Sequence, residues 1–497
     1  MTATPEHLSP RRYVLGRHET RSLLGRREGG EVAVVIGGVV LGVLASLITG
    51  GSRTGFVLLA VFVLGSIALV YLPWRGRTPY RWLPVDLRFT VQRQRGGDEF
   101  GGNAREAGID IATGVERDVP PPEAVGPLRW FSQSFAGAEL AILARLEDGS
   151  LTSVLEIEGP GVGLFDGPDQ EGMVARWGAV LRDLANSEGF VSRIGLLERC
   201  MPVDPQAHDR YIAEFDGLAV PEQLRLSYDA LHDQVGAVSE QHRNFLVVRI
   251  SGDRALAKAS KLAGGGDEGL GAVVLREVEA LAARLEDAGI RVLHGLGPRR
   301  TAALIASLYN PDHPMDDTVG MTPRNAWPRS TWNAREHLEV DDGDWFHATA
   351  WIKTWPLVAV GVNFLAPLLV QTPGVIRTVA VTLDLIPTDV AMTTAMSDLT
   401  TDAANSSAAA KAGRTADPRD DRQLSQAELR AYDIAQGAGG VKAVGYVTVS
   451  ARTAEHLELA KRRLRTAGAR AWLTLEWCDK EHDKAFVNTL PLARGLR

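Results

Sequence analysis

Two long apolar runs, separated by a short polar loop, dominate the hydrophobic pattern near the N-terminus. The first run extends from about Val32 to Gly50 and the second from about Phe56 to Leu72, and neither contains a charged residue. Helices of this length measure roughly 25–29 Å, close to the thickness of the bilayer hydrocarbon. The loop 51–55 is so short that the helices must be antiparallel. The pattern predicts a transmembrane hairpin over residues 31–73; the alternatives are a buried helical hairpin and a targeting segment.

The pattern after the hairpin changes to short strands and amphipathic helices. Residues 74–127 contain clusters of Gly and Pro and are predicted to be a juxtamembrane linker. From residue 128 onward, apolar runs with strand character alternate with runs of helical spacing, which predicts a first α+β domain over 128–310. Strands are expected at 139–146, 151–157, 190–197 and 245–250, and helices at 170–186, from 221, at 272–288 and at 301–308.

A second α+β domain is predicted over residues 343–497, after a Pro- and Asp-rich connector at 311–342. The segment Trp345–Trp355 alternates between two faces, as a strand does. Residues 397–425 have almost no large apolar side chains and are predicted to be a mobile insertion. Further strands are expected at 375–386, 440–450 and 469–477, and helices at 358–369, from 387, at 425–436 and from 453. Residues 480–490 are expected to form a terminal helix or turn. The predicted fold class is α+β, with a two-helix transmembrane hairpin followed by two mixed-sheet cytoplasmic domains.

Arginines flank the predicted hairpin on both sides, and a basic segment, 1–30, precedes it. The loop between the two runs has Arg53 as its one basic residue. Arginine-rich flanks stay on the cytoplasmic side, so both termini are expected in the cytoplasm. The hairpin is expected to cross the cell membrane (inner or plasma membrane) twice. The membrane-flanking basic residues closest to the runs are Arg21, Arg26, Arg27, Arg75, Arg77 and Arg81.

The charge is unevenly distributed along the chain. Residues 1–95 contain 13 Arg, no Lys and five acidic residues, a net charge of +8, so the remainder carries −15 of the total of −7. The basic part suits an anionic membrane surface, and the acidic part repels phosphate, so nucleic acid is not an expected partner. Abundant Ala, Gly, Arg and Asp with few Lys indicate a GC-rich bacterial genome. Cys200 and Cys478 are interpreted as reduced core cysteines of a cytoplasmic domain.

No motif in the chain points to catalysis, a cofactor or a metal. The phosphate-loop pattern G-x-x-x-x-G-K-[ST] is absent, and the glycines at 159–163 are interpreted as a turn. The acidic residues at 312–317 are predicted to form a solvated loop, and His347 to be a structural histidine on a strand. The basic residues between Arg452 and Arg470 are interpreted as a solvated helix face; a docking patch for an acidic partner or DNA is the alternative.

Several short segments resemble an actinobacterial family associated with conjugation and type IV secretion, often described as PrgI-like. The resemblance covers nearly the whole chain, and its motifs are structural, not catalytic. It rests on Tyr13–Arg17 and Glu19–Leu24, on Val154–Ile157 followed by Trp177, on Ala302–Asn310 (A-A-L-I-A-S-L-Y-N) with Pro311, on Ile386-Pro387 and on Thr489–Leu492.

The resemblance implies an architecture and a role. In this family the membrane hairpin is similar to a small inner-membrane subunit, and the soluble part to the N-terminal, non-catalytic region of the secretion ATPase. In that ATPase an apolar-Pro-apolar segment, here Leu490–Leu492, precedes the motor domain, which is expected to be missing from this chain. The implied role is a non-enzymatic anchor and docking platform for a separate ATPase and other subunits, with homo-oligomerisation open. Two further readings are a membrane subunit of a type VII secretion core and an enzyme with an unrecognised site.

Overall fold

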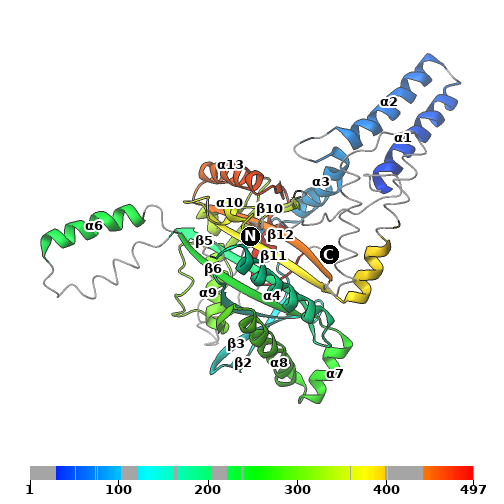
Figure 1. Ribbon diagram of the computed structural model, residues 1–497. Coiled ribbons are helices and arrows are strands. Elements are labelled where there is room, and N and C mark those ends of the chain that lie inside the picture. Colours follow the sequence, from blue (N-terminus) through cyan, green and yellow to red (C-terminus); the bar gives the residue numbers. More distant parts are fainter. Residues whose placement is uncertain are drawn as a thin grey trace, which may run out of the picture. The chain divides into compact units, whose positions relative to one another are not determined.

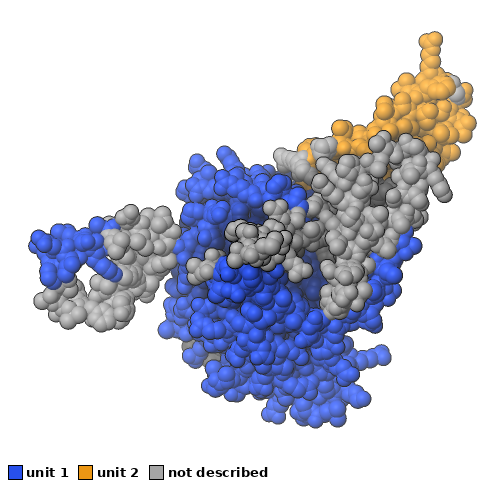
Figure 2. Space-filling model, viewed as in Figure 1, with its two compact units in different colours: residues 1–15, 99–400, 422–497 blue, residues 16–98, 401–421 orange. Residues whose placement is uncertain are grey.

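The chain folds into two compact units, coloured separately in Figure 2. One contains residues 1–15, 99–400 and 422–497, and the other contains 16–98 and 401–421. The computed structural model describes residues 29–50, 52–72, 74, 77–101, 121–161, 165–202, 221–236, 240–356, 358, 360–397, 400 and 440–495. The predicted insertion and the helix expected at 425–436 lie almost wholly outside these ranges.

The smaller unit consists of three helices in the described part (Figure 1): α1 (Gly29–Ile48), α2 (Arg53–Tyr71) and α3 (Pro79–Gln94). Helices α1 and α2 match the two predicted apolar runs. Helix α3 lies inside the segment predicted to be a linker, which corrects that prediction. It begins with Pro79 at its first position, where a missing N–H costs nothing, and it contains a second proline, Pro84. This proline and the mixture of aromatic and basic side chains hide its helical pattern.

Small residues let α1 and α2 pack closely. A Cβ atom added to Gly42 would lie 3.2 Å from the Cα atom of Leu59, and one added to Gly38 would lie 2.9 Å from the carbonyl oxygen of Phe62. A Cβ atom added to Gly37, the residue next to Gly38, would have no neighbour within 4 Å. Glycines spaced four residues apart on one helix face allow two backbones to approach, as in membrane helix pairs.

The larger unit is built on one 13-stranded sheet. Its strands pair in the order β1 (Glu99–Gly101), β8 (Ser330–Asn333), β9 (Leu338–Val340), β10 (Trp345–Thr354), β12 (Gly440–Ala451), β11 (Ile376–Ile386), β5 (Val191–Pro202), β6 (Glu240–Ile250), β4 (Leu151–Glu158), β3 (Ala138–Arg145) and β2 (Leu128–Phe135). In addition, β13 (Thr474–Trp477) pairs with β10, and β7 (Arg291–Gly295) pairs with β4.

Every strand pairing in the described part of this sheet is antiparallel, so the prediction of mixed sheets is wrong. The helical crossovers are the physical reason. Each joins two strands that run in the same direction but are not neighbours, because an antiparallel strand lies between them. Thus β4 and β5 both pair with β6, and β10 and β11 both pair with β12. This arrangement is the split βαβ motif.

The motif occurs twice in the sheet. In the first half the strand order is β7-β4-β6-β5, with α4 (Gly167–Asn186) after β4 and α8 (Gly266–Asp287) after β6. The second half repeats it as β13-β10-β12-β11, with the short α10 (Ala366–Leu369) and then α13 (Ala454–Arg470) in the same places. The halves correspond to the predicted domains 128–310 and 343–497, but both lie in one compact unit.

The halves join where β5 pairs with β11. Leu197 lies opposite Ala380 and Leu196 lies opposite Val381 at the centre of this pairing. Because β5 and β11 occupy the same place in their halves and run antiparallel, the two halves are related by an approximate local two-fold axis through this seam. One hydrophobic core crosses it, since Leu197, Ala380 and Phe486 belong to the same buried cluster.

Helices cover both faces of the sheet. Helices α4 and α8 pack on one face of the first half, over a core that includes Leu155 and Leu246, and α13 packs on the second half over Val447 and Val449. On the other face, α9 (Pro298–Tyr309) and α14 (His482–Phe486) cover the core that crosses the seam. The other α-helices in the described ranges are α6 (Glu222–Gly236), α7 (Arg254–Leu262) and one at 388–397, and two short 3-10 helices lie at Asp341–Gly343 and Val487–Thr489.

Three other predictions need correction. The helix predicted at 358–369 is reduced to the four residues of α10. Pro367 lies in the first turn of α10, a position that tolerates proline, whereas in a helix over 358–369 it would lie in the interior, where proline removes a hydrogen bond. The last strand begins at Thr474 and not at 469, because α13 continues to Arg470. The predicted connector contains β8 and β9, whose lengths of four and three residues give little periodic signal. The strands expected at 151–157, 375–386 and 440–450 are confirmed with shifts of one residue at their ends, and the strand expected at 245–250 is confirmed but begins five residues earlier, at Glu240.

Candidate functional site

The outer surface of the α1–α2 pair is apolar. Leu47 is 70% exposed and Leu64 is 64% exposed, and the exposed large side chains of both helices are almost all apolar. Each helix is long and apolar enough, by length and composition, to cross a membrane, and each is only 17% buried within the structure. A core helix of a soluble protein would be mostly buried, so this surface calls for an apolar environment or partner.

Of the six membrane-flanking arginines, the structure describes Arg77 and Arg81; Arg21, Arg26, Arg27 and Arg75 lie outside the described residues. The Nε atom of Arg81 donates to Oε1 of Glu31 at 3.0 Å, and the side chain of Glu31 is 1% exposed. This ion pair ties α3 to the first turn of α1. The guanidinium of Arg77 lies 5.1 Å from the ring of Trp82. Arg81 therefore holds α3 against α1 at the end of the hairpin, whereas the contact of Arg77 is local, between the residues before α3 and its first turn.

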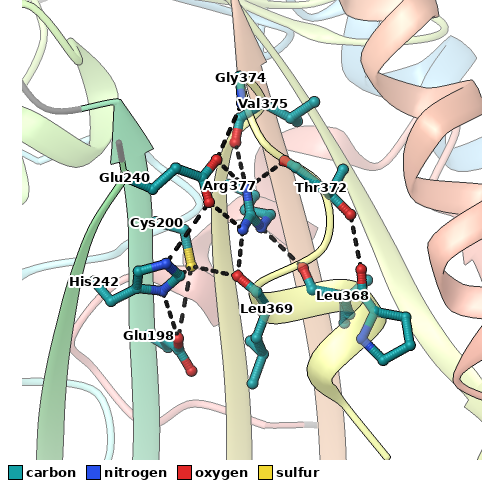
Figure 3. A network of polar contacts seen from close by, with 11 residues as sticks. Glu198, Cys200, Glu240, His242, Leu368, Leu369, Thr372, Gly374, Val375 and Arg377 are labelled. Atoms are coloured by element: carbon teal, nitrogen blue, oxygen red, sulfur yellow. Dashed lines mark hydrogen bonds and ion pairs between the residues drawn. The ribbon is translucent and has the colours of Figure 1, made fainter. Parts of the chain in front are cut away.

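A second group of polar side chains lies where β5, β6 and β11 meet (Figure 3). Glu198 and Cys200 are two residues apart on β5, and His242 lies directly opposite Cys200 on β6. The Nδ1 atom of His242 lies 3.0 Å from Oε1 of Glu198 and 3.4 Å from Sγ of Cys200, and Sγ lies 3.7 Å from Oε1. The thiol is fully buried, whereas the side chains of His242 and Glu198 are 28% and 21% exposed.

Arg377 supports this group from β11, where it lies opposite Cys200. Its side chain is fully buried and forms a two-pronged ion pair with Glu240, at 3.0 Å and 2.7 Å. It also donates to the carbonyl oxygens of Leu368, Thr372 and Val375 at 2.8–2.9 Å. Through these hydrogen bonds the buried guanidinium fixes the end of α10, the loop between α10 and β11, and the carboxylate of Glu240 (Figure 3).

The chemistry of this group depends on the thiol. Burial raises the pKa of Cys200 to about 12, although the nearby charge of Arg377 acts in the opposite direction. Without a further cation the thiol is therefore neutral and a poor nucleophile. Thiolate, imidazole and carboxylate together are, however, a ligand set that suits Zn²⁺. We refer to Glu198, Cys200 and His242 as the strand-end cluster.

Comparison with models of protein families and with curated protein sequences finds no match for this chain.

The acidic connector is neutralised by arginines. Asp316 accepts two hydrogen bonds from Arg243, at 2.8 Å and 3.2 Å, and one from Arg300 at 3.0 Å. Burial raises the pKa of Asp316, but these arginines outweigh it and hold the pKa below its usual range. Asp312 accepts a hydrogen bond from the indole of Trp345 at 3.0 Å. These carboxylates serve as anchors for neighbouring strands and helices.

The interpretation of His347 as a structural histidine is confirmed. Its ring is fully buried, and its Nδ1 and Nε2 atoms lie 2.8 Å from the hydroxyl of Ser450 and the carbonyl oxygen of Tyr309. Because a carbonyl only accepts, Nε2 carries the proton and Nδ1 accepts from Ser450. Burial lowers the pKa of His347 to about 3, outweighing the opposite effect of the Tyr309 carbonyl.

Cys200 and Cys478 are both buried and form no disulfide, as expected from their interpretation as core cysteines. The strand-end cluster, by contrast, was not predicted from the sequence. Its signal is a repeated spacing, Glu198-x-Cys200 on one strand and Glu240-x-His242 on the next, which places all four side chains on one face of the sheet. The cluster was missed because the pairing of these strands brings together residues more than 40 positions apart.

Proposed function

We propose that this chain is a non-catalytic inner-membrane subunit of a type IV secretion or conjugation-like apparatus. Its α1–α2 hairpin spans the membrane with both termini in the cytoplasm, and its α+β unit is the docking platform for a separately encoded ATPase. The observation that carries the membrane role is the apolar surface of α1 and α2, which is exposed along almost the full length of both helices.

Three features support the membrane role. The helices of 20 and 19 residues are about 29 Å long, which matches the hydrocarbon thickness. The glycines at their contact surface permit the close approach typical of membrane helix pairs. Arginines outnumber acidic residues on both flanks of the hairpin, which favours retention of both ends in the cytoplasm.

Helix α3 fits a position in the membrane interface. Leu83 and Leu87, four residues apart, are 68% and 65% exposed, so they form an unburied apolar stripe. The same helix carries Arg81, Arg88 and Arg93, which suit anionic lipid headgroups. A helix with an apolar stripe and basic side chains binds in the plane of the membrane surface. In this proposal α3 marks the level at which the chain leaves the bilayer.

The docking role rests on the resemblance to the PrgI-like family and on the lack of a phosphate-loop motif in the sequence. A platform also needs accessible contact residues. Helix α6 provides some, because Leu224, Leu226 and Tyr228 are between 42% and 62% exposed.

Membrane insertion is tested with Leu64→Asp, which places a carboxylate at an exposed position in the middle of α2. A charged residue at the centre of a membrane helix costs about 2.5–3.5 kcal/mol on insertion scales. The variant is therefore expected to lose resistance to alkaline carbonate extraction, while Leu64→Ala keeps it. Wild-type protein that carbonate releases completely from membranes would contradict the hairpin.

The partner is tested by affinity purification of the full-length protein in mild detergent from its native cells, followed by mass spectrometry. Co-purification of a phosphate-loop ATPase together with conjugation-type membrane subunits is expected. Recovery of type VII core subunits would instead assign the chain to that apparatus. A matched purification of a variant with Leu224, Leu226 and Tyr228 changed to Ser tests whether α6 is a contact surface.

A further inference from the structure

The strand-end cluster has the composition and spacing of a metal site. Its three side chains offer one sulfur, one nitrogen and one oxygen ligand atom, all within 4.8 Å of one another. They come from the rigid ends of two paired strands and not from loops, since Glu198 and Cys200 lie on β5 and His242 on β6.

The separations match the edges of a tetrahedron. With Zn–S distances of about 2.3 Å and Zn–N and Zn–O distances of about 2.0–2.1 Å, ligand atoms around tetrahedral zinc lie about 3.2–3.6 Å apart. The three separations in the strand-end cluster are 3.0, 3.4 and 3.7 Å. A cation bound by these atoms therefore requires side-chain shifts of only a few tenths of an ångström.

We propose that Glu198, Cys200 and His242 bind one Zn²⁺ ion, with water as the fourth ligand. Binding forms a bond from the metal to the thiolate sulfur and releases the thiol proton to solvent. Cys200 supplies the soft ligand that selects zinc over Mg²⁺ and Ca²⁺, which prefer sites made entirely of oxygen. The partial exposure of His242 and Glu198 provides the path by which the ion and its water enter.

The surroundings supply the support that metal ligands need. The Nε2 atom of His242, which faces away from the other two ligands, lies 3.7 Å from the carboxylate of Glu240. Metal-binding histidines commonly direct their second nitrogen to such a carboxylate, which orients the ring. Glu240 is in turn held by Arg377, whose side chain is completely buried. Ligand, orienting carboxylate and buried arginine thus form a connected set (Figure 3).

The local two-fold axis provides an internal comparison. One row of residues that lie opposite one another on β11, β5 and β6 consists of Arg377, Cys200 and His242. The local axis relates it to a second row on β5, β11 and β12, which consists of Arg193, Asp384 and Lys442. In the second row Arg193 forms an ion pair with Asp384. The arginine is present in both rows, but the thiol and imidazole replace an ordinary aspartate and lysine in only one. The split βαβ motif therefore does not itself require a thiol and an imidazole at these two positions.

The position of the site indicates what the metal does. Strand β5 ends at Pro202 and β6 begins at Glu240, so the ligands lie where residues 203–239 leave and re-enter the sheet. The sulfur also lies 3.7 Å from the carbonyl oxygen of Leu369, the last residue of α10, and Arg377 donates to the same carbonyl. A bound ion would fix the base of the segment that carries α6, independently of any membrane or secretion role.

The test uses the full-length protein in detergent, with its affinity tag removed, stripped of metal by a chelator under reducing conditions. Titration with Co²⁺ is expected to produce the visible bands of tetrahedral cobalt and a near-ultraviolet thiolate-to-cobalt band, both saturating at one ion per chain. Zn²⁺ should then displace the cobalt and remove both signals. Absence of the thiolate band in the wild-type protein would overturn the proposal.

Variants separate the site from adventitious binding. Cys200→Ser is expected to abolish the thiolate band, and Glu240→Gln to weaken binding by about 10–100-fold. Cys478→Ser, which removes the other thiol, and Asp384→Asn, in the symmetry-related row, should leave the titration unchanged. Glu198→Gln hardly changes the shape of the side chain, so weaker binding in this variant would not be due to unfolding. It should weaken binding at least 10-fold. A thiolate band that survives Cys200→Ser, or unchanged affinity in Glu198→Gln, would contradict the assignment.

Discussion

Several polar side chains of the larger unit are buried with full sets of partners, and they are where single substitutions should act most strongly. Arg377 and His347 are both completely buried and both lie on strands of the second half. Burying a charged or polar group is costly unless hydrogen bonds replace its water. Substitution of either residue should therefore lower the free energy of unfolding by an amount that depends on its hydrogen bonds.

His347 should make the stability of the larger unit depend on pH. Its pKa is about 3 in the folded protein, below the ordinary value of 6.5, so the unfolded chain binds more protons between these values. The stabilising effect is complete above pH 6.5 and is lost as the pH falls toward 3. In this window the free energy of unfolding should fall by up to about 1.4 kcal/mol per pH unit because of this residue.

The measurement is urea unfolding of residues 99–497 at several pH values between 4 and 7, for the wild type and for His347→Gln. Glutamine does not titrate and can still donate to the carbonyl of Tyr309. The difference in stability between the two proteins should therefore shrink, or reverse in sign, as the pH falls. Parallel pH profiles would show that the pKa of His347 is the same in the folded and unfolded states.

Arg377 and Arg193 offer a matched pair, since the local two-fold axis relates them. Arg377→Met leaves Glu240 buried without its partner, and breaking such a pair costs about 3–5 kcal/mol. Arg193→Met should cost clearly less, because Arg193 and Asp384 are 17% and 26% exposed and water can replace the lost contacts. Denaturant midpoints of the two variants measure the difference. Equal losses of stability would mean that the buried contacts of Arg377 contribute no more to the free energy of unfolding than the partly exposed contacts of Arg193.

At the scale of helices and strands, the contact between α1 and α2 depends on individual glycines. Gly42→Val places new atoms against the backbone of Leu59, whereas Gly37→Val meets no neighbour within 4 Å. Overpacking of this kind costs about 1–3 kcal/mol. The apparent melting temperature of residues 16–98 in detergent, followed by circular dichroism, should fall for Gly42→Val and stay near the wild-type value for Gly37→Val. Similar losses in both would argue against this helix contact.

The sequence predicted the individual strands and helices better than it predicted which strands pair with one another. Continuous apolar runs such as Phe245–Ile250, and alternation such as Trp345–Trp355, carry a local signal that identified strands correctly. Helix α3 was missed because Pro84 and scattered arginines break its pattern. The seam between β5 and β11 could not be predicted, because its partners are more than 170 residues apart and nothing local specifies the pairing. The strand-end cluster depends on such pairings and was missed for the same reason.

At the scale of the whole molecule, the shared sheet predicts that residues 99–497 behave as one cooperative body. One core contains side chains from both halves, and β5 and β11 pair along eight residue pairs. A fragment of residues 99–497 should therefore be soluble without detergent and should unfold in a single transition seen equally by fluorescence and circular dichroism. The full-length chain should need detergent. Two separate transitions would mean that the halves fold as the independent domains predicted from the sequence.

The local two-fold axis has a consequence for how this protein can specialise. Two identical subunits that pair through equivalent strands must carry every feature twice, once on each side of their axis. Here both copies of the motif belong to one polypeptide, so each can change without altering the other. The row with Cys200 and the row with Asp384 show the result: the same arginine stands in both, beside different chemistry. A covalently joined pseudo-dimer can thereby have two chemically unlike ends.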